Sequence, residues 1–168
     1  KRNDEFSVNI ALVHGHHPIL GVVHAPALET TYFAREGGGA WRQDGNDRPA
    51  PIHVRKLGNR RPVVAGSRSH AGTRLGRFLE AVGPHKLISM GSALKSCLVA
   101  EGVADLYVRL GPTSEWDTAA AQCVVEEAGG QITDTGMQPL RYNTKDSLLN
   151  PHFFVFGAES REIGRAHV

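Results

Sequence analysis

The sequence is poor in cysteine, in long apolar runs and in aromatic residues. Two cysteines in 168 residues cannot build a disulfide framework, and their positions match no zinc-site spacing. The apolar runs are short, like the one at 19–23, well below the roughly 18 residues that span a bilayer. These absences exclude a disulfide-stapled secreted domain and a membrane-spanning protein. They favour a reducing compartment, so we expect the cytoplasm.

A strong charge imbalance is also missing, because 19 Lys and Arg stand against 17 Asp and Glu, for a net charge of +2. The basic excess belongs to the first half of the chain, and its densest part is a turn with Arg55, Lys56, Arg60 and Arg61. No aromatic residue interleaves with these side chains to stack on bases. We therefore interpret the turn as a solvated loop and expect no nucleic-acid partner; no protein partner is implied either.

The remaining composition is that of one globular domain, with 40% apolar residues. The chain starts at Lys1, without Met and without a signal-peptide pattern, and the charged run 1–5 leads straight into a predicted strand. We therefore expect that its true beginning is missing.

The first part of the chain predicts an antiparallel meander. Apolar side chains alternate with polar ones along 6–12, which is typical of a half-buried strand, and share one face: Phe6, Val8, Ile10 and Leu12. A turn at 14–18 leads into a strand at 19–23, so we expect a hairpin with a loop longer than two residues. The histidines of this turn lack a nearby carboxylate or cysteine at ligand spacing, so we interpret them as solvated. Further short strands and a tight glycine turn are expected at 31–34, 40–41 and 37–39.

From residue 62 onward, strands alternate with helices. Strands are expected at 62–66, 86–89, 105–109, 131–133 and 153–156. Apolar residues at helical spacing predict helices over 75–82, from Gly91 and Ser92 to near Gly102, and from Asp117 to the glycine pair 129–130. The change of pattern predicts two parts: the end of a first α+β subdomain at 1–58 and an α/β subdomain at 59–168.

Polar residues at the ends of these elements are the candidates for chemistry. Gly91 and Ser92 open a predicted helix, so their backbone N–H groups and the helix dipole favour an anion, with Lys95 one turn further on. The alternative is an ordinary helix start, in which Ser92 is an N-cap and Lys95 a surface lysine.

Three further residues have two interpretations each. Asp117 opens a predicted helix next to the small run 119–121, which permits close approach of another element; it is either a cap or an oxygen ligand for Mg²⁺. Arg109 ends a predicted strand and is either a surface arginine or a bidentate phosphate ligand. His70, in the turn Ser67–His70, either has no special role or packs on a ligand. Together these features indicate phosphate chemistry on Mg²⁺.

The positions of the cysteines and the absence of several motifs argue against other kinds of catalytic site. Cys97 and Cys123 each lie on an apolar face of a predicted helix, so we expect buried thiols without a catalytic role. The sequence holds no serine nucleophile elbow, no Walker loop and no paired-histidine zinc helix.

Residues 91–130 carry a specific segment, GSALKSCLVAEGVADLYVRLGPTSEWDTAAAQCVVEEAGG. It closely resembles the bacterial CysQ-type 3′(2′),5′-bisphosphate nucleotidases of the inositol monophosphatase superfamily. The resemblance covers almost the whole chain and includes RNDEFSVNIALV, PILGVVHAP, SRSH and PLRYNTKDSLLNPHF. It implies the α/β fold of that superfamily, with mixed α and β layers, in an N-terminally truncated form. The implied location is the cytoplasm, with peripheral attachment at the bacterial inner membrane as the alternative.

The resemblance also implies an activity and its residues. The implied enzyme is a Mg²⁺-dependent, lithium-sensitive phosphatase that removes the 3′-phosphate of adenosine 3′,5′-bisphosphate to give AMP, in sulfate assimilation and nucleotide recycling. Asp117 corresponds to the metal-binding aspartate of the family's Trp-Asp motif, and is the one catalytic and metal-binding residue expected here. The family's nucleotide and phosphate contacts correspond to His70, Gly91, Ser92, Lys95 and Arg109.

Two departures from the family pattern limit what the chain is expected to do. Ala121 stands where the family commonly has glycine, which is a small change. The chain also begins just after the place of the family's Asp-Pro-Leu-Asp-Gly-Thr motif, so it lacks most of the expected metal-binding carboxylates. We therefore expect a partial metal site and little or no turnover. The alternatives are a non-catalytic nucleotide-binding remnant and a superfamily phosphatase acting on inositol or sugar phosphates. A missing layer is also expected to expose apolar faces of the meander.

Overall fold

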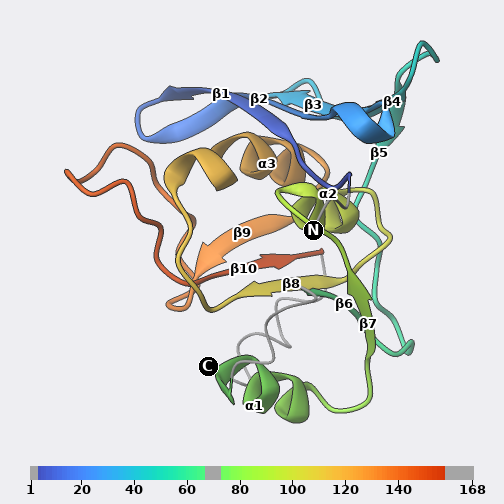
Figure 1. Cartoon of the computed structure of the whole chain (residues 1–168), viewed down its shortest axis with the longest axis vertical. Helices are drawn as coiled ribbons and strands as arrows, with labels where there is room; N and C mark the ends of the chain where they lie inside the picture. The colour runs from blue at the N-terminus through green and yellow to red at the C-terminus, as the bar shows by residue number, and fades with distance from the viewer. Residues whose placement is uncertain (1–3, 67–72, 158–168) are drawn as a thin grey trace.

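A computed structural model describes residues 4–66 and 73–157, which form two β-sheets with helices between and below them. Figure 1 shows the layers from top to bottom: the first sheet, the helices α2 (Leu94–Ala100) and α3 (Glu115–Glu127), the second sheet, and α1 (Thr73–Val82). The predicted fold of mixed α and β layers is confirmed.

The first sheet is the predicted antiparallel meander. Its five strands follow one another in chain order, each paired antiparallel with the next. They are β1 (Val8–His14), β2 (His17–Ala25), β3 (Thr30–Arg35), β4 (Ala40–Asp44) and β5 (Ala50–Ile52), with a short 3₁₀ turn at Pro26–Leu28. Strand β5 is not predicted from the sequence pattern.

The turn between β1 and β2 corrects one prediction. It has two residues, Gly15 and His16, and not a longer loop. Both have positive φ, +54° and +68°, which is the backbone that a two-residue hairpin turn requires and that matches the twist of its strands. The prediction failed because histidine is an uncommon residue at such a position, so the Gly-His pair did not stand out as a tight turn.

The face of β1 that lies against the rest of the molecule also differs from the usual pattern. Val8, Ile10 and Leu12 are exposed, Ile10 by 60%, whereas the alternate residues, among them Ala11 and Val13, pack against the core. The inner face has to accept α3 at close range, so it carries small side chains, and the larger apolar ones point away. The apolar outer face of β1 is therefore exposed to solvent.

The second sheet is mixed, with the strand order β7-β6-β8-β10-β9. Its central β6 is parallel to β7 and β8, and β10 is antiparallel to β8 and β9. The strands lie close to the predicted ranges: β6 (Val63–Gly66), β7 (Lys86–Ser89), β8 (Leu106–Arg109), β9 (Gln131–Asp134) and β10 (Phe153–Phe156). Below this sheet α1 packs through Phe78, whose ring stacks on Phe154 at 5.5 Å.

Helix α3 fills the space between the two sheets. Its small residues, Ala119, Ala120 and Ala121, are buried, and the backbone of Ala120 lies directly against Gly21 of β2. A Cβ atom on Gly21 would lie 2.2 Å from the Ala120 carbonyl oxygen. The prediction that this small run permits close approach of another element is confirmed.

Two carboxylates attach loops to these layers. The buried Asp105 accepts two hydrogen bonds from the Arg55 guanidinium, at 2.8 and 2.6 Å, and one from the Val63 N–H at 2.7 Å. The prediction of a solvated basic turn is therefore wrong for Arg55, although its neighbour Lys56 is exposed. Glu127 of α3 accepts hydrogen bonds from the N–H groups of the predicted glycine turn at 37–39.

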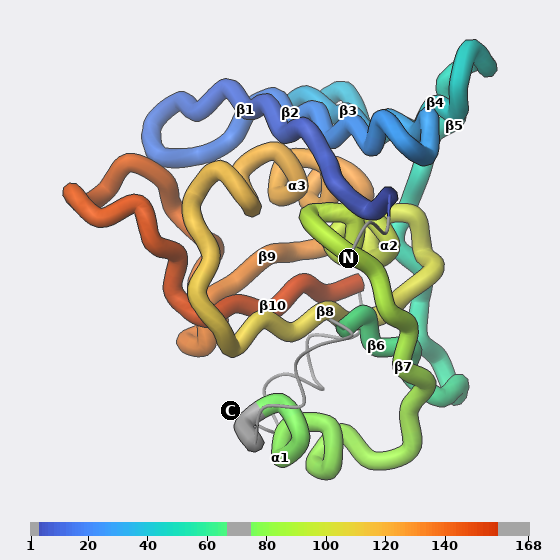
Figure 2. Tube along the Cα trace, viewed as in Figure 1, coloured from blue at the N-terminus to red at the C-terminus, as the bar shows by residue number. Residues whose placement is uncertain are grey.

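The connection between the sheets bears on the predicted division of the chain. Residues 53–62 run down one side of the molecule, from β5 to β6 (Figure 2). Helices α2 and α3 lie between the two sheets. The division into subdomains at 1–58 and 59–168 stays a prediction. None of the described helices is both long enough and apolar enough to span a membrane.

Replacing Gly21 tests the contact with α3. We expect Gly21→Ala to lower the free energy of unfolding by about 3 kcal/mol, because the added methyl group meets backbone that has no room to move. The matched control is Gly76→Ala in α1, where a Cβ meets nothing within 4 Å and the change should stabilise by about 0.5–1 kcal/mol. Urea unfolding of the three proteins measures both values; equal stability of Gly21→Ala and the parent would contradict the packing described here.

Candidate functional site

A cavity of about 260 Å³ opens where the end of β8 meets the segments that lead into α2 and α3. Its lining includes five of the six residues predicted from the sequence: Gly91, Ser92, Lys95, Arg109 and Asp117. The sixth, His70, lies outside the described residues. Residues that are far apart in the sequence thus meet at one place, as the phosphate-site hypothesis requires.

Lys95 is buried, so the alternative of a surface lysine is wrong. Its Nζ donates to the backbone carbonyls of Met90 at 3.1 Å and Ser92 at 3.0 Å, and lies 5.2 Å from the centre of the Tyr107 ring. Burial, together with the nearby charge of Arg109, lowers the pKa of Lys95 to about 8. An ammonium has three N–H donors, so one remains for a ligand after the two carbonyls are served.

Arg109 ends β8 and is half-buried at the cavity wall. One of its Nη2 hydrogens goes to the Pro112 carbonyl at 3.1 Å. Its Nε is buried and makes no hydrogen bond within the described parts of the chain. Leaving a buried charged donor without a partner is costly, so such a group in a cavity is suited to an anionic ligand.

Asp117 does not open α3 but is its third residue, because the helix begins at Glu115 with Ser114 as the N-cap. The backbone N–H of Ser114 donates to Asp117 Oδ2 at 2.9 Å, and the Asp117 N–H donates to the Ser114 carbonyl at 2.8 Å. The cap interpretation and the site interpretation are thus not exclusive: Asp117 caps the helix end and also lines the cavity.

The segment before α2 differs from the predicted helix start. The helix begins at Leu94, and Ser92 has a φ of +53°, a left-handed conformation that excludes it as an N-cap. The Ser92 hydroxyl is instead hydrogen-bonded to the Ser7 hydroxyl. A Cβ on Gly91 would lie 2.7 Å from the Glu5 carbonyl oxygen, so glycine is what allows the chain near residue 5 to lie on this turn.

The described residues do not form a complete metal site. No group of three or more His, Cys, Asp or Glu side chains capable of holding a metal was found among residues 4–66 and 73–157. Mg²⁺ requires about six oxygen ligands, and at the cavity Asp117 offers a single carboxylate. Two of the three histidines of the first turn have other partners: His16 Nδ1 lies 2.8 Å from the Tyr142 carbonyl, and His17 pairs with Glu126 at 3.1 Å.

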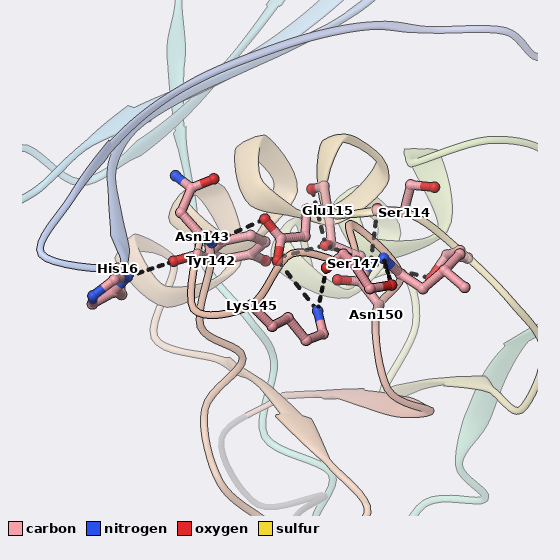
Figure 3. A network of polar contacts seen from close by, with 11 residues as sticks. His16, Ser114, Glu115, Tyr142, Asn143, Lys145, Ser147 and Asn150 are labelled. Atoms are coloured by element: carbon pink, nitrogen blue, oxygen red, sulfur yellow. Dashed lines mark hydrogen bonds and ion pairs between the residues drawn. The ribbon is translucent and has the colours of Figure 1, made fainter.

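Several residues of the cavity and of its surroundings are not predicted from the sequence. Tyr107, Thr113, Thr118 and Phe153 also line the cavity. Burial raises the pKa of Tyr107 to about 12; the charge of Arg109 lowers this pKa and that of Asp117 raises it, both by smaller amounts. Behind the start of α3 lies a polar network formed with the segment 142–150 (Figure 3). That segment was recognised only by its resemblance to the family, and its sequence pattern gives none of these contacts.

The two cysteines do not line the cavity. Cys97 and Cys123 are buried and unpaired, as predicted. Burial raises the pKa of both thiols, that of Cys123 to about 12. They therefore stay protonated near neutral pH and do not supply a nucleophile.

Known proteins of similar sequence are bacterial nucleotidases. The chain is 49% identical over 155 residues to the 3′(2′),5′-bisphosphate nucleotidase CysQ of Escherichia coli (strain K12), which covers 92% of the chain and 61% of that protein. It is 40% identical over 161 residues to the Haemophilus influenzae nucleotidase of the same name, covering 95% of the chain and 60% of that protein. The chain thus spans about three fifths of the length of these curated relatives.

The fold has a matching crystal structure as well. The structure of CysQ from Bacteroides thetaiotaomicron, described as a bacterial member of the inositol monophosphatase family, superposes with a TM-score of 0.85 at 37% identity. The match covers 94% of this chain and 65% of that one. Since the sequence model of the same family also matches residues 1–162, this chain belongs to the inositol monophosphatase family.

Proposed function

We propose that the cavity binds adenosine 3′,5′-bisphosphate, and that the chain is the nucleotide-binding part of a phosphatase that removes the 3′-phosphate to give AMP. The observation that carries the proposal is the pair of cations at one cavity, Lys95 and Arg109, of which Arg109 has a buried donor without a partner among the described residues. The nucleotidase names of relatives at 40–49% identity support the choice of substrate.

The described residues are suited to binding a phosphate group. A guanidinium matches two phosphate oxygens in a bidentate manner, and an ammonium acts as a compact point charge. Burial lowers the pKa of Lys95 most, and the charge of Arg109 lowers it further because two cations repel each other. A bound dianion would relieve that repulsion and accept the free N–H groups, so both cations favour an occupied cavity over an empty one.

Hydrolysis of a phosphate monoester also requires an activated water and balanced charge on the leaving oxygen. The resemblance to the family implies Mg²⁺ for this task, but the described residues offer one carboxylate at the cavity and do not hold the ion by themselves. Lys95 and Arg109 balance phosphate charge without activating water. We therefore propose that this chain alone binds the nucleotide and turns it over little or not at all, with the cytoplasm as its location.

Replacing Lys95 tests the binding site. We expect Lys95→Met to weaken adenosine 3′,5′-bisphosphate binding about tenfold or more, since a hydrogen bond to a charged group is lost. Calorimetric titration measures the dissociation constant, and thermal unfolding shows whether the variant folds. The control is Lys86→Met, the same change at an exposed lysine of β7, which should bind like the parent. Equal affinity of Lys95→Met and the parent would contradict the site.

The lowered pKa of Lys95 predicts a pH dependence of the same affinity. Below about pH 8 the ammonium is charged, and as the pH rises through about 8 the free protein loses this proton. Binding of the dianion should therefore weaken from pH 7 to pH 9.5. The second ionisation of the phosphate, near pH 6, is complete below that range. Lys95→Met should lack this decline; a parent affinity that stays constant across the range would be inconsistent with the assignment.

The single carboxylate predicts the response to Mg²⁺. We expect adenosine 3′,5′-bisphosphate to bind this chain with the same affinity with and without Mg²⁺, and no phosphate to be released. Calorimetry and a phosphate-release assay measure the two. The comparison variant is Asp117→Asn. Binding that Mg²⁺ strengthens in the parent but not in this variant, or substantial turnover by the pure chain, would show that the chain assembles a working metal site.

A further inference from the structure

The segment 135–152, between β9 and β10, contains no helix or strand, yet it is firmly attached to the start of α3. The Glu115 N–H donates to the Leu148 carbonyl at 2.8 Å, and the Asn150 N–H donates to the Thr113 carbonyl at 2.9 Å. Figure 3 shows the segment lying along the entry to the helix. Long segments of this kind are usually functional, so the contacts it makes near the cavity call for an explanation.

The side chain of Asn150 concentrates these contacts at one point. Its Nδ2 lies 2.8 Å from the Ser114 carbonyl, 3.0 Å from Thr118 Oγ1 and 3.2 Å from Thr113 Oγ1. An amide has two N–H donors, so the three acceptors share them. Asn150 itself does not line the cavity, whereas Thr113 and Thr118 do. One amide behind the wall therefore holds the residues that form the wall.

These contacts extend to the predicted metal-binding aspartate. Ser114 is joined to Asp117 in both directions, because its N–H donates to Oδ2 and its carbonyl accepts from the Asp117 N–H. That same carbonyl is the nearest acceptor of Asn150 Nδ2. Asn150 thus holds the carbonyl of Ser114, and the N–H of the same residue orients the Asp117 carboxylate.

We propose that Asn150 is a positioning residue of the candidate site: through Ser114 and the two threonines it sets where Asp117 stands at the cavity. The proposal rests on the proposed function, because it assumes that the cavity is where the ligand binds. Asn150 does not touch the ligand. Its effect on affinity comes from keeping the wall in the conformation that the ligand meets, which is the usual role of residues that support a binding constellation.

A second attachment of the same segment supplies the matched control. Buried Glu115 accepts a hydrogen bond from the Asn143 N–H at 3.0 Å and pairs with Lys145 Nζ at 3.5 Å, and Lys145 also donates to the Ser147 carbonyl at 3.0 Å. Neither Glu115 nor Lys145 lines the cavity. Lys145→Met therefore loosens the segment without touching the acceptors of Asn150.

The experiment compares Asn150→Ala and Asn150→Asp with Lys145→Met in the full chain, at a temperature where thermal unfolding shows all of them folded. We expect both Asn150 variants to bind adenosine 3′,5′-bisphosphate about tenfold more weakly, and Lys145→Met to bind like the parent. Asn150→Asp keeps the shape of the side chain but places a carboxylate oxygen against the Ser114 carbonyl, which can only accept, so it should be no better than alanine. Parent-like affinity of both folded Asn150 variants would overturn the proposal.

Amide hydrogen exchange decides the question without any ligand. In the Asn150 variants we expect exchange at Ser114 and Asp117 to accelerate about tenfold, while the middle of α3 stays as protected as in the parent. Unchanged exchange at both amides would overturn the positioning role. Acceleration throughout α3 would also overturn it, because it would show that Asn150 stabilises the whole helix. If the parent chain does not bind the nucleotide, the proposed function fails, and the exchange pattern still decides what Asn150 does.

Discussion

The close approach of α3 to the first sheet fixes the helix whose first turn forms one wall of the cavity. At Gly21 the strand and the helix backbone touch, so the helix can neither slide nor rotate without a clash. Its opposite side is in contact with β9 of the second sheet. With the helix fixed between two layers, its first turn, with Ser114 and Asp117, comes to the carboxyl end of β8 beside Arg109. The cavity is therefore a consequence of the packing of small residues some distance away.

Much of this fold can be predicted from periodicity, because a period of two or of 3.6 is a local property of the chain. The meander and the alternation of strands and helices after residue 62 follow from it. Which face of a strand is covered is a tertiary property, and the pattern at β1 is the same whichever face packs. Ile10 and Ala11 show this: the larger residue is exposed and the smaller one packs inward, because the neighbour on that side is a helix at close range.

The site was predictable as a set of residues but not as an arrangement. Lysine in a helical pattern is usually exposed, so nothing local indicated that Lys95 would be buried with its ammonium on two carbonyls. Ser92 is predicted as an N-cap because N-caps favour serine, but it has a positive φ and its hydroxyl contacts Ser7, which is distant in the sequence. Asn150 carries no local signal at all, since its three acceptors lie more than 30 positions away in the sequence.

The buried charged groups of the chain have two kinds of surroundings, one in the ion pairs that connect its layers and another at the cavity. Asp105 is satisfied by Arg55, and Glu101 by Arg42 and the Tyr32 hydroxyl, so these groups are fully used by the fold. Lys95 is buried near the half-buried Arg109, and its ammonium donates to two backbone carbonyls. Burial and the charge of Arg109 lower the pKa of Lys95, and the negative charge of Glu5 offsets part of that effect. Two cations at one cavity repel each other, and an anion bound between them would offset that repulsion. This electrostatic repulsion is the basis of the proposal that the cavity binds a phosphate group.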